Sequence, residues 1–363
     1  MTDARMILLN PGPVTLTDRV RKAMSRADWC HREPEFAALS KDVNRRLANL
    51  YPGSRREFAA VSMTGSGTCA VEAMLSSLAP RDGVTMIVAN GVYGERMAGM
   101  LDAQGKRSIC VQSEWLEPMA LAEVEKHLEE ERAIAAVAAV HHETTTGRLN
   151  DMNALGRLCK AHGRPLLLDA VSSFGAEEIL FDEWNVQALA GTANKCLHGV
   201  PGICFVIVDR DVLERSQSQA NSVYLDIFRY FKTQDDDGYS PFTQAVQSAF
   251  ALQEALIELE ESGGWRERRS RYRSIAQSIQ DTAASHRVDT LLAPQEYSSV
   301  LWSYVLPEGV AYTELHDSLK RKGFVIYAGQ GHLGSRIFRI AHMGDIRDSD
   351  VERFQAALTS FFG

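Results

Sequence analysis

The sequence lacks several features that mark common classes of protein. Its six cysteines are scattered with no CxxC spacing, so neither a disulfide framework nor a metal site is predicted. The most apolar internal run, residues 133–140, is too short to span a bilayer, and the mixed charge of residues 1–5 lacks the apolar core of a signal peptide. We therefore expect a cytoplasmic protein with free thiols and no membrane partner.

Positive charge is also in short supply. Lys and Arg number 39 against 47 Asp and Glu, which gives a formal net charge of -8. This balance argues against nucleic acid as a partner, although a local cluster of basic residues can still bind an anionic substrate. A chain of 363 residues with 45% hydrophobic residues suits one large globular domain plus a smaller one.

Short apolar segments alternate with helical patterns over the first two thirds of the chain. Strands are predicted at residues 58–63, 84–89, 133–141, 166–169, 188–191 and 203–208, with a helix over 69–78 after the first. This order predicts an α/β fold with a mostly parallel central sheet covered by helices. The polar and glycine-rich strand ends then gather at the carboxyl edge, where open sheets bind ligands.

The pattern changes after a predicted helix over residues 243–261, which ends at Ser262-Gly263-Gly264. A smaller α+β domain is predicted from a charged helix over 265–285, strands at 299–305, 324–327 and 337–340, and a closing helix over 348–362. We expect an N-terminal arm at 1–20, a large cofactor-binding domain at 21–255 and a small C-terminal domain at 256–363.

The most informative residues are an aspartate and a lysine. Asp169 follows the apolar run 165–168, and Lys195 ends the small-residue segment Gly191-Thr192-Ala193-Asn194-Lys195 one strand later. Such a lysine can condense with the aldehyde of pyridoxal phosphate, while a buried aspartate keeps the pyridine nitrogen protonated. The plainer alternatives are a lysine in solvent and a carboxylate that caps the next turn through Ser172 or Ser173.

A candidate phosphate site precedes the first predicted helix, at Thr64-Gly65-Ser66-Gly67-Thr68. Backbone N–H groups and hydroxyls at a helix N-terminus form an anion site. The segment lacks the Walker lysine and the third glycine of a dinucleotide fingerprint, so a monophosphate fits better than ATP or NAD. The alternative is a plain glycine turn with Ser66 as the helix cap.

Three further segments are candidates for the same site. Tyr93, on the predicted loop 90–94, could stack on a flat cofactor or pack beneath its loop. Residues 143–146 offer hydroxyls at a strand end, or form a polar turn. Arg339 alternates with apolar Phe338 and Ile340, so its side chain should point away from the core, either to bind a carboxylate or phosphonate or to lie exposed.

Together these motifs resemble the class V aminotransferases of pyridoxal-phosphate fold type I, over nearly the whole chain. The segments that carry the resemblance are Leu9-Asn10-Pro11-Gly12-Pro13, Asp28-Trp29-Cys30, 65–72, 90–94, 143–147, 169–175, 193–196, 199–202, 323–327 and 338–340. Trp29-Cys30 and the Glu-Thr-Thr-Thr-Gly run point, with less force, to a branch that acts on phosphonates.

The resemblance implies pyridoxal 5'-phosphate as the cofactor. Lys195 would bond it covalently and carry the proton, and Asp169 would bind its pyridine nitrogen. Tyr93 and Val171 would pack on its two faces, and Thr144 would reach its ring oxygen. Its phosphate would be held by Ser66, Gly67, Thr68 and Thr192, with Thr243 from a neighbouring subunit, which implies a homodimer with a shared site.

The resemblance also implies transfer of the amino group of 2-aminoethylphosphonate to pyruvate, which gives phosphonoacetaldehyde and alanine. Arg339, with Gly12 and Ser173, would hold the substrate anion. Two places near this pocket depart from the family pattern: Asn10 stands where threonine is common, and Ala341-His342-Met343 replaces a less bulky, more polar run.

The identity of the amino donor is therefore open. The alternatives are a sister aminotransferase of the alanine:glyoxylate or serine:pyruvate type, and one that acts on another phosphonate or sulfonate amine. A cofactor-binding sensor without turnover and a plain α/β binding domain without the cofactor are the remaining alternatives. Cysteine desulfurase is disfavoured, because no cysteine lies on an evident mobile loop.

Overall fold

The computed structural model describes residues 5–363, so the first four residues of the predicted arm lie outside the described residues. Its main sheet has seven strands in the order β2-β10-β9-β8-β5-β3-β4. Their bounds are β2 Phe58–Gly65, β3 Val84–Ala89, β4 Ser108–Gln112, β5 Ile134–Val140, β8 Leu166–Asp169, β9 Val186–Thr192 and β10 Gly202–Asp209. β10 runs antiparallel to both its neighbours and the other pairs are parallel, which confirms the predicted mostly parallel α/β sheet.

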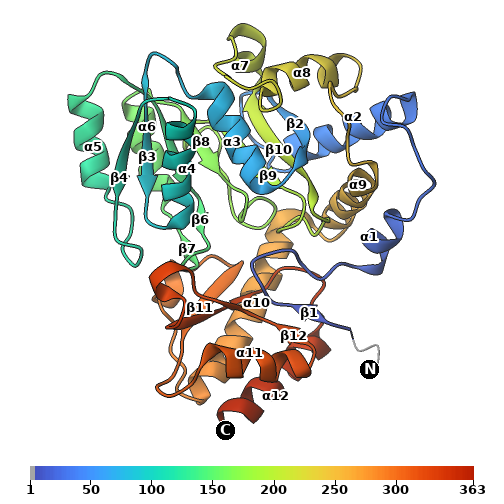
Figure 1. Cartoon of the computed structure of the whole chain (residues 1–363), viewed down its shortest axis with the longest axis vertical. Helices are drawn as coiled ribbons and strands as arrows, with labels where there is room; N and C mark the ends of the chain where they lie inside the picture. The colour runs from blue at the N-terminus through green and yellow to red at the C-terminus, as the bar shows by residue number, and fades with distance from the viewer. Residues whose placement is uncertain (1–4) are drawn as a thin grey trace.

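Helices cover both faces of this sheet (Figure 1). One apolar core is shared with α2 (Pro34–Ala48), α5 (Leu121–Glu130), α6 (Met152–Ala161) and α9 (Val246–Glu261). The other is shared with α3 (Gly67–Leu78), α4 (Val92–Ala103), α7 (Arg210–Arg215) and α8 (Ile227–Asp236). Strands covered on both faces are apolar along their length rather than alternating, and β3 is buried at all six positions.

The strand register brings the candidate segments to one edge. Asp169, the last residue of β8, pairs with Ala190 of β9. β10 begins at the same edge, because Gly202 lies opposite Gly65 and Cys204 lies opposite Thr192. The glycine loop after β2, Asp169 and the segment that follows β9 therefore share the carboxyl edge of the sheet.

The C-terminal part holds a smaller antiparallel sheet, in the order β11-β14-β13, with its own apolar core. Its elements are α10 (Gly264–Ser285), β11 (Leu301–Val305), α11 (Tyr312–Arg321), β13 (Tyr327–Ala328), β14 (Ile337–Ala341) and α12 (Asp348–Phe362). This confirms the smaller α+β unit, while the domain limits at residues 20 and 255 stay predictions. Within residues 5–363, no helix combines the length and apolar character that crossing a membrane requires.

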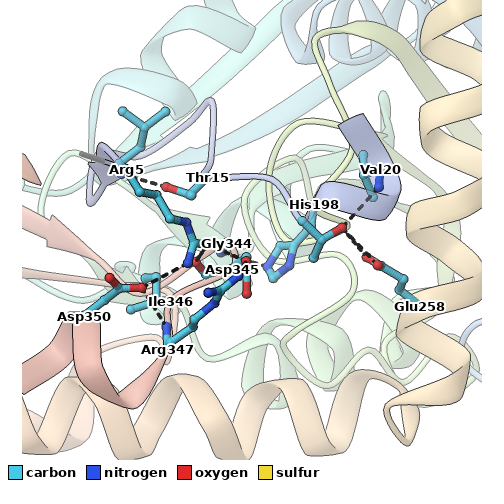
Figure 2. Close-up of polar contacts among 12 residues, drawn as sticks. Arg5, Thr15, Val20, His198, Glu258, Gly344, Asp345, Ile346, Arg347 and Asp350 are labelled. Atoms are coloured by element: carbon cyan, nitrogen blue, oxygen red, sulfur yellow. Dashed lines mark hydrogen bonds and ion pairs between the residues drawn. The ribbon is translucent and has the colours of Figure 1, made fainter. Parts of the chain in front are cut away.

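The N-terminal segment connects the two parts. β1 (Ile7–Leu8) pairs in parallel with β12 (Phe324–Val325) of the C-terminal part. Arg5 bonds both Asp345 and Asp350, and Thr15 forms a bridge with Gly344 (Figure 2). At the other end, Thr17 caps α1 (Asp18–Ala23) and its hydroxyl lies 2.9 Å from Glu258 of α9. The intervening residues 8–14 are thus held between two anchored ends.

Three predicted elements differ in the structure, and strand β4 has no predicted counterpart. The strand predicted over 324–327 is two strands in different sheets, because β1 supplies a separate partner for β12. The helix predicted from residue 243 begins at Val246, since Thr64 Oγ1 accepts from the backbone of Ala245 and holds the preceding residues outside the helix. β4 was not predicted, because only its Val111 is buried. The prediction of a loop over residues 90–94 is wrong from Val92 onward, because α4 begins at that residue.

Candidate active site

Lys195 lies in the turn between β9 and β10. The turn is closed by His198 N–H donating to the Lys195 carbonyl at 3.0 Å and Gly199 N–H donating to the Ala193 carbonyl at 2.8 Å. The side chain points inward, where its Nζ donates to the carbonyl of Pro11. Burial lowers the pKa of Lys195 to about 8. This enclosed amine is not the solvent-exposed lysine of the plainer alternative.

Asp169 presents a buried carboxylate beside this amine. Its Oδ1 accepts from Val171 N–H at 2.9 Å, while the Ser173 hydroxyl donates to Ala170, so the carboxylate does not cap the turn through Ser173. Burial raises the pKa of Asp169 to about 6, and the Lys195 charge acts in the opposite direction. No ion pair holds Asp169 within residues 5–363, and a protonated pyridine nitrogen fits that requirement.

The glycine loop presents free hydroxyls at the start of α3. Ser66 occupies the N-cap position, but its side chain makes no capping hydrogen bond. Ser66 and Thr68 are both exposed, whereas Gly67 is buried so tightly that a Cβ there would stand 2.6 Å from Val171 Cγ1. Thr192 differs, because its hydroxyl already bonds Asn194 at 2.9 Å. The loop is thus shaped to receive an anion at Ser66 and Thr68.

A cavity lies between the glycine loop before α3 and the end of β8. Nine residues line it: Gly67, Thr68, Val71, Tyr93, Arg96, Met97, Met100, Asp169 and Val171. Tyr93, in the first turn of α4, and Val171 therefore face one space that also holds the Asp169 carboxylate. A flat ring between them can meet an aromatic face, an aliphatic face and a carboxylate together.

Glu143 ends the short strand β6 (His142–Glu143), which follows β5, and Thr144 comes directly after it. The Thr144 hydroxyl is buried without a hydrogen-bond partner in the described chain, and a cofactor ring oxygen is an acceptor that would satisfy it. Glu143, which sequence reasoning left without a role, accepts from Tyr93 N–H at 3.3 Å and from the Thr145 hydroxyl at 2.6 Å. Burial raises the pKa of Glu143 to about 7. Its contacts hold the first turn of α4, and with it Tyr93.

Arg339 is a buried guanidinium on β14. Phe338 and Ile340 lie in the C-terminal core, the orientation that the alternation predicts. Arg339 Nε donates to Ala328 and Nη1 to Thr144, both at 2.8 Å to backbone carbonyls. Burial lowers the pKa of Arg339, and no carboxylate pairs with it in the described part of the chain. A buried arginine without a counterion is suited to an anionic ligand.

The structure gives less direct support for a site role of the remaining predicted residues, Gly12, Ser173 and Thr243. Gly12 lies against Lys195, whereas the buried Ser173 hydroxyl is engaged with Ala170 and is not brought to Arg339 by any described contact. Thr243 is exposed beside Thr64. The two departures are absorbed locally: Asn10 donates to the Pro13 carbonyl at 3.0 Å, and a ring nitrogen of buried His342 bonds the Ser299 carbonyl at 3.0 Å.

Comparisons with known proteins cover the chain nearly from end to end. The family model for Aminotransferase class-V matches residues 35–347. A 2-aminoethylphosphonate–pyruvate transaminase of Bacillus mycoides (strain KBAB4) is 37% identical over 357 residues, 97% of each chain. An alanine–glyoxylate aminotransferase of Nostoc sp. superimposes with a TM-score of 0.90 at 25% identity, over 100% of this chain and 97% of that one. A subgroup IV aspartate aminotransferase of Thermus thermophilus superimposes with a TM-score of 0.88 at 26% identity, over 98% of this chain and 99% of that one.

Proposed function

We propose, from the premise that this chain belongs to the class V aminotransferase family, that it transfers the amino group of 2-aminoethylphosphonate to pyruvate. The products are phosphonoacetaldehyde and L-alanine, and the cofactor is pyridoxal 5'-phosphate. The observation that carries the chemistry is the Lys195 amine, held against Gly12 and the Pro11 carbonyl and close enough to the buried Asp169 carboxylate for their charges to interact. The choice of donor is supported by the 37% identity to the Bacillus mycoides transaminase.

The cofactor, when bound, supplies an electron-accepting ring that stabilises negative charge on the substrate carbon. Lys195 Nζ would hold it covalently, and the same amine would move the proton to and from the substrate carbon. Asp169 holds the proton on the ring nitrogen, and Tyr93 and Val171 orient the ring. The Thr144 hydroxyl would donate to the ring oxygen, and Ser66, Gly67 and Thr68 would hold the phosphate. The Thr192 hydroxyl would join them by exchanging its bond to Asn194 for one to the phosphate.

Arg339 receives the substrate anion. Its Nε donates to a backbone carbonyl, and its Nη1 donates to a backbone carbonyl and to Gln330 Oε1 at 3.3 Å. Nη2 donates no hydrogen bond within residues 5–363. The carbonyls fix the plane of the guanidinium and leave Nη2 to the ligand. A dianionic phosphonate gains more from this group than a carboxylate does, which favours the phosphonate donor. Pyruvate then uses the same arginine in the second half of the reaction.

The active form is a homodimer in the cytoplasm under this proposal. Thr243 is exposed beside Thr64, next to the phosphate loop. In a dimer that joins two subunits at this surface, Thr243 of each subunit would reach the phosphate site of the other. Val223 and Tyr224 expose apolar surface in the same region, and the Tyr224 hydroxyl donates to the Thr64 carbonyl at 2.7 Å. All six cysteines are free thiols, which suits a reducing compartment.

A panel of amino donors with pyruvate or glyoxylate as acceptor tests this function. 2-Aminoethylphosphonate with pyruvate should give the highest kcat/KM, and Lys195→Ala should abolish turnover. Faster transfer from alanine to glyoxylate, or from serine to pyruvate, would assign the chain to a sister activity. A borohydride-sensitive visible band without turnover of any donor would indicate a sensor, and absence of that band after incubation with pyridoxal phosphate would reject the cofactor.

A further inference from the structure

The phosphate loop contains no cation. Ser66, Gly67, Thr68 and Thr192 provide backbone N–H groups and hydroxyls only, yet the phosphate they are proposed to hold is a dianion. We propose that Arg96 binds the cofactor phosphate and supplies the positive charge that the loop lacks. This inference rests on the proposed function, because it deepens the same site.

Arg96 lies on the wall of the cofactor cavity. It follows Tyr93 by three positions on α4, so both side chains project from the same face of the helix. Among the described residues that line the cavity, Arg96 is the one cationic side chain. Its Nη1 stands 3.5 Å from the Thr68 hydroxyl, at the far limit of a hydrogen bond, which leaves its donors available for a stronger acceptor.

Arg96 also contacts the ring that we propose to stack on the cofactor. Its guanidinium carbon lies 4.7 Å from the centroid of the Tyr93 ring. That distance is within the range of a cation–π interaction, which fixes the guanidinium near the mouth of the cavity without neutralising its charge. The phosphate loop, Arg96 and Tyr93 thus form one continuous wall.

No carboxylate neutralises Arg96 within residues 5–363. Its neighbour Glu95 is occupied by Gln112 at 2.9 Å and Trp115 at 2.8 Å. The charge of Arg96 also reaches the catalytic groups: burial dominates the pKa shifts of Asp169 and Lys195, and Arg96 adds a smaller lowering of both pKa values. No ion pair within the described residues therefore accounts for the position of Arg96 on the wall of this cavity.

The test compares two aldehydes that differ only in the phosphate. Apoprotein is titrated with pyridoxal phosphate and with pyridoxal, and binding is followed by the visible band of the lysine-bound chromophore. Arg96→Gln should weaken pyridoxal phosphate about tenfold or more, the range of a lost charge-assisted hydrogen bond, and leave pyridoxal unchanged. Arg96→Lys should keep part of the affinity. Arg107→Gln, at an exposed arginine just beyond α4, should leave the affinity for both aldehydes unchanged.

A second measurement covers the case in which pyridoxal binds too weakly to titrate. Inorganic phosphate competes with pyridoxal phosphate, and its inhibition constant should rise by a similar factor in Arg96→Gln. Equal losses for both aldehydes, an unchanged affinity, or an unchanged phosphate constant would overturn the role of Arg96. Failure of the unsubstituted protein to bind pyridoxal phosphate would instead overturn the proposed function itself, and this inference with it.

Discussion

Gly12 lies directly against the side chain of Lys195. A Cβ at Gly12 would stand 2.7 Å from Lys195 Cδ and 3.2 Å from Nζ, and the φ angle of Gly12 is +115°. The Pro11 carbonyl accepts from the same Nζ. The anchored N-terminal segment thus forms one wall of the space around the reactive amine, and only a residue without a side chain fits there.

Gly12→Ala should therefore displace Lys195 with little effect on the rest of the fold. We expect kcat to fall about 10- to 100-fold, the scale of a small misplacement of a reacting group. Gly53→Ala is the matched control, because Gly53 has a similar φ of +111° but nothing within 4 Å of its Cβ position. Equal losses of activity in both variants would show that backbone strain, and not the contact with Lys195, causes the effect.

The reactivity of Lys195 should follow its lowered pKa. A neutral amine attacks an aldehyde and an ammonium does not, so the rate of cofactor attachment to apoprotein should rise with pH through about 8 and level off above it. The measurement is the rate of appearance of the lysine-bound band at a series of pH values. A rise that continues to the ordinary value near 10.5 would show that burial does not perturb this amine.

Asp169 should destabilise the apoprotein at neutral pH. Its pKa rises from 3.8 to about 6 on folding, so the charged form is disfavoured in the folded state by about 3 kcal/mol at pH 8. Asp169→Asn removes that cost and keeps the acceptor for Val171 N–H. The variant should be more stable by about this amount above pH 6, with a gain that fades as the pH falls from about 6 to 4.

The same variant should lose activity, because a neutral amide cannot keep the ring nitrogen protonated. Denaturant unfolding of both apoproteins at pH 8 and pH 4 measures the stability, and single turnovers measure the activity. A variant that is less stable than its parent at pH 8 would contradict the buried, unpaired state of the carboxylate.

Local sequence patterns were sufficient to place the sheet and its ligand edge. The strands that end at Asp169 and Thr192 are buried apolar runs bounded by polar or small residues, a signal contained within each segment. The candidate phosphate loop is equally local, because glycines and hydroxyls directly precede a helix. The local structure of each of these segments could therefore be predicted without knowledge of its neighbours.

Contacts between distant segments could not be predicted in this way. β1 pairs with a strand more than 300 residues away, and nothing in either dipeptide specifies the other. Glu143 holds the start of α4 by accepting from Tyr93 across 50 residues. Because the sequence pattern predicts a loop over residues 90–94, it does not reveal the i,i+3 relation of Tyr93 to Arg96. A helix that begins at Val92 is the feature that places Arg96 on the same face as Tyr93.

Arg339→Ala should separate substrate binding from cofactor binding. The guanidinium contacts Ala328 and Thr144 through backbone carbonyls and has no carboxylate partner in the described residues, so its loss removes the anion receptor without leaving a buried acid unpaired. We expect KM for 2-aminoethylphosphonate to rise by about 100-fold, the range of a lost hydrogen bond between charged groups. The visible band of the bound cofactor should persist, because no described contact joins Arg339 to the phosphate loop or Asp169.

Arg336→Ala is the control, because Arg336 is exposed just before the same strand. Arg339→Lys keeps the charge but loses the planar fork, so KM should lie between the values for the parent and for Arg339→Ala. An amine donor without an anionic group, such as propylamine, should react equally slowly with the parent and with Arg339→Ala, since it gives the arginine nothing to bind. If KM for the phosphonate is unchanged in Arg339→Ala, another group holds the anion, and the preference for a phosphonate donor needs a different structural basis.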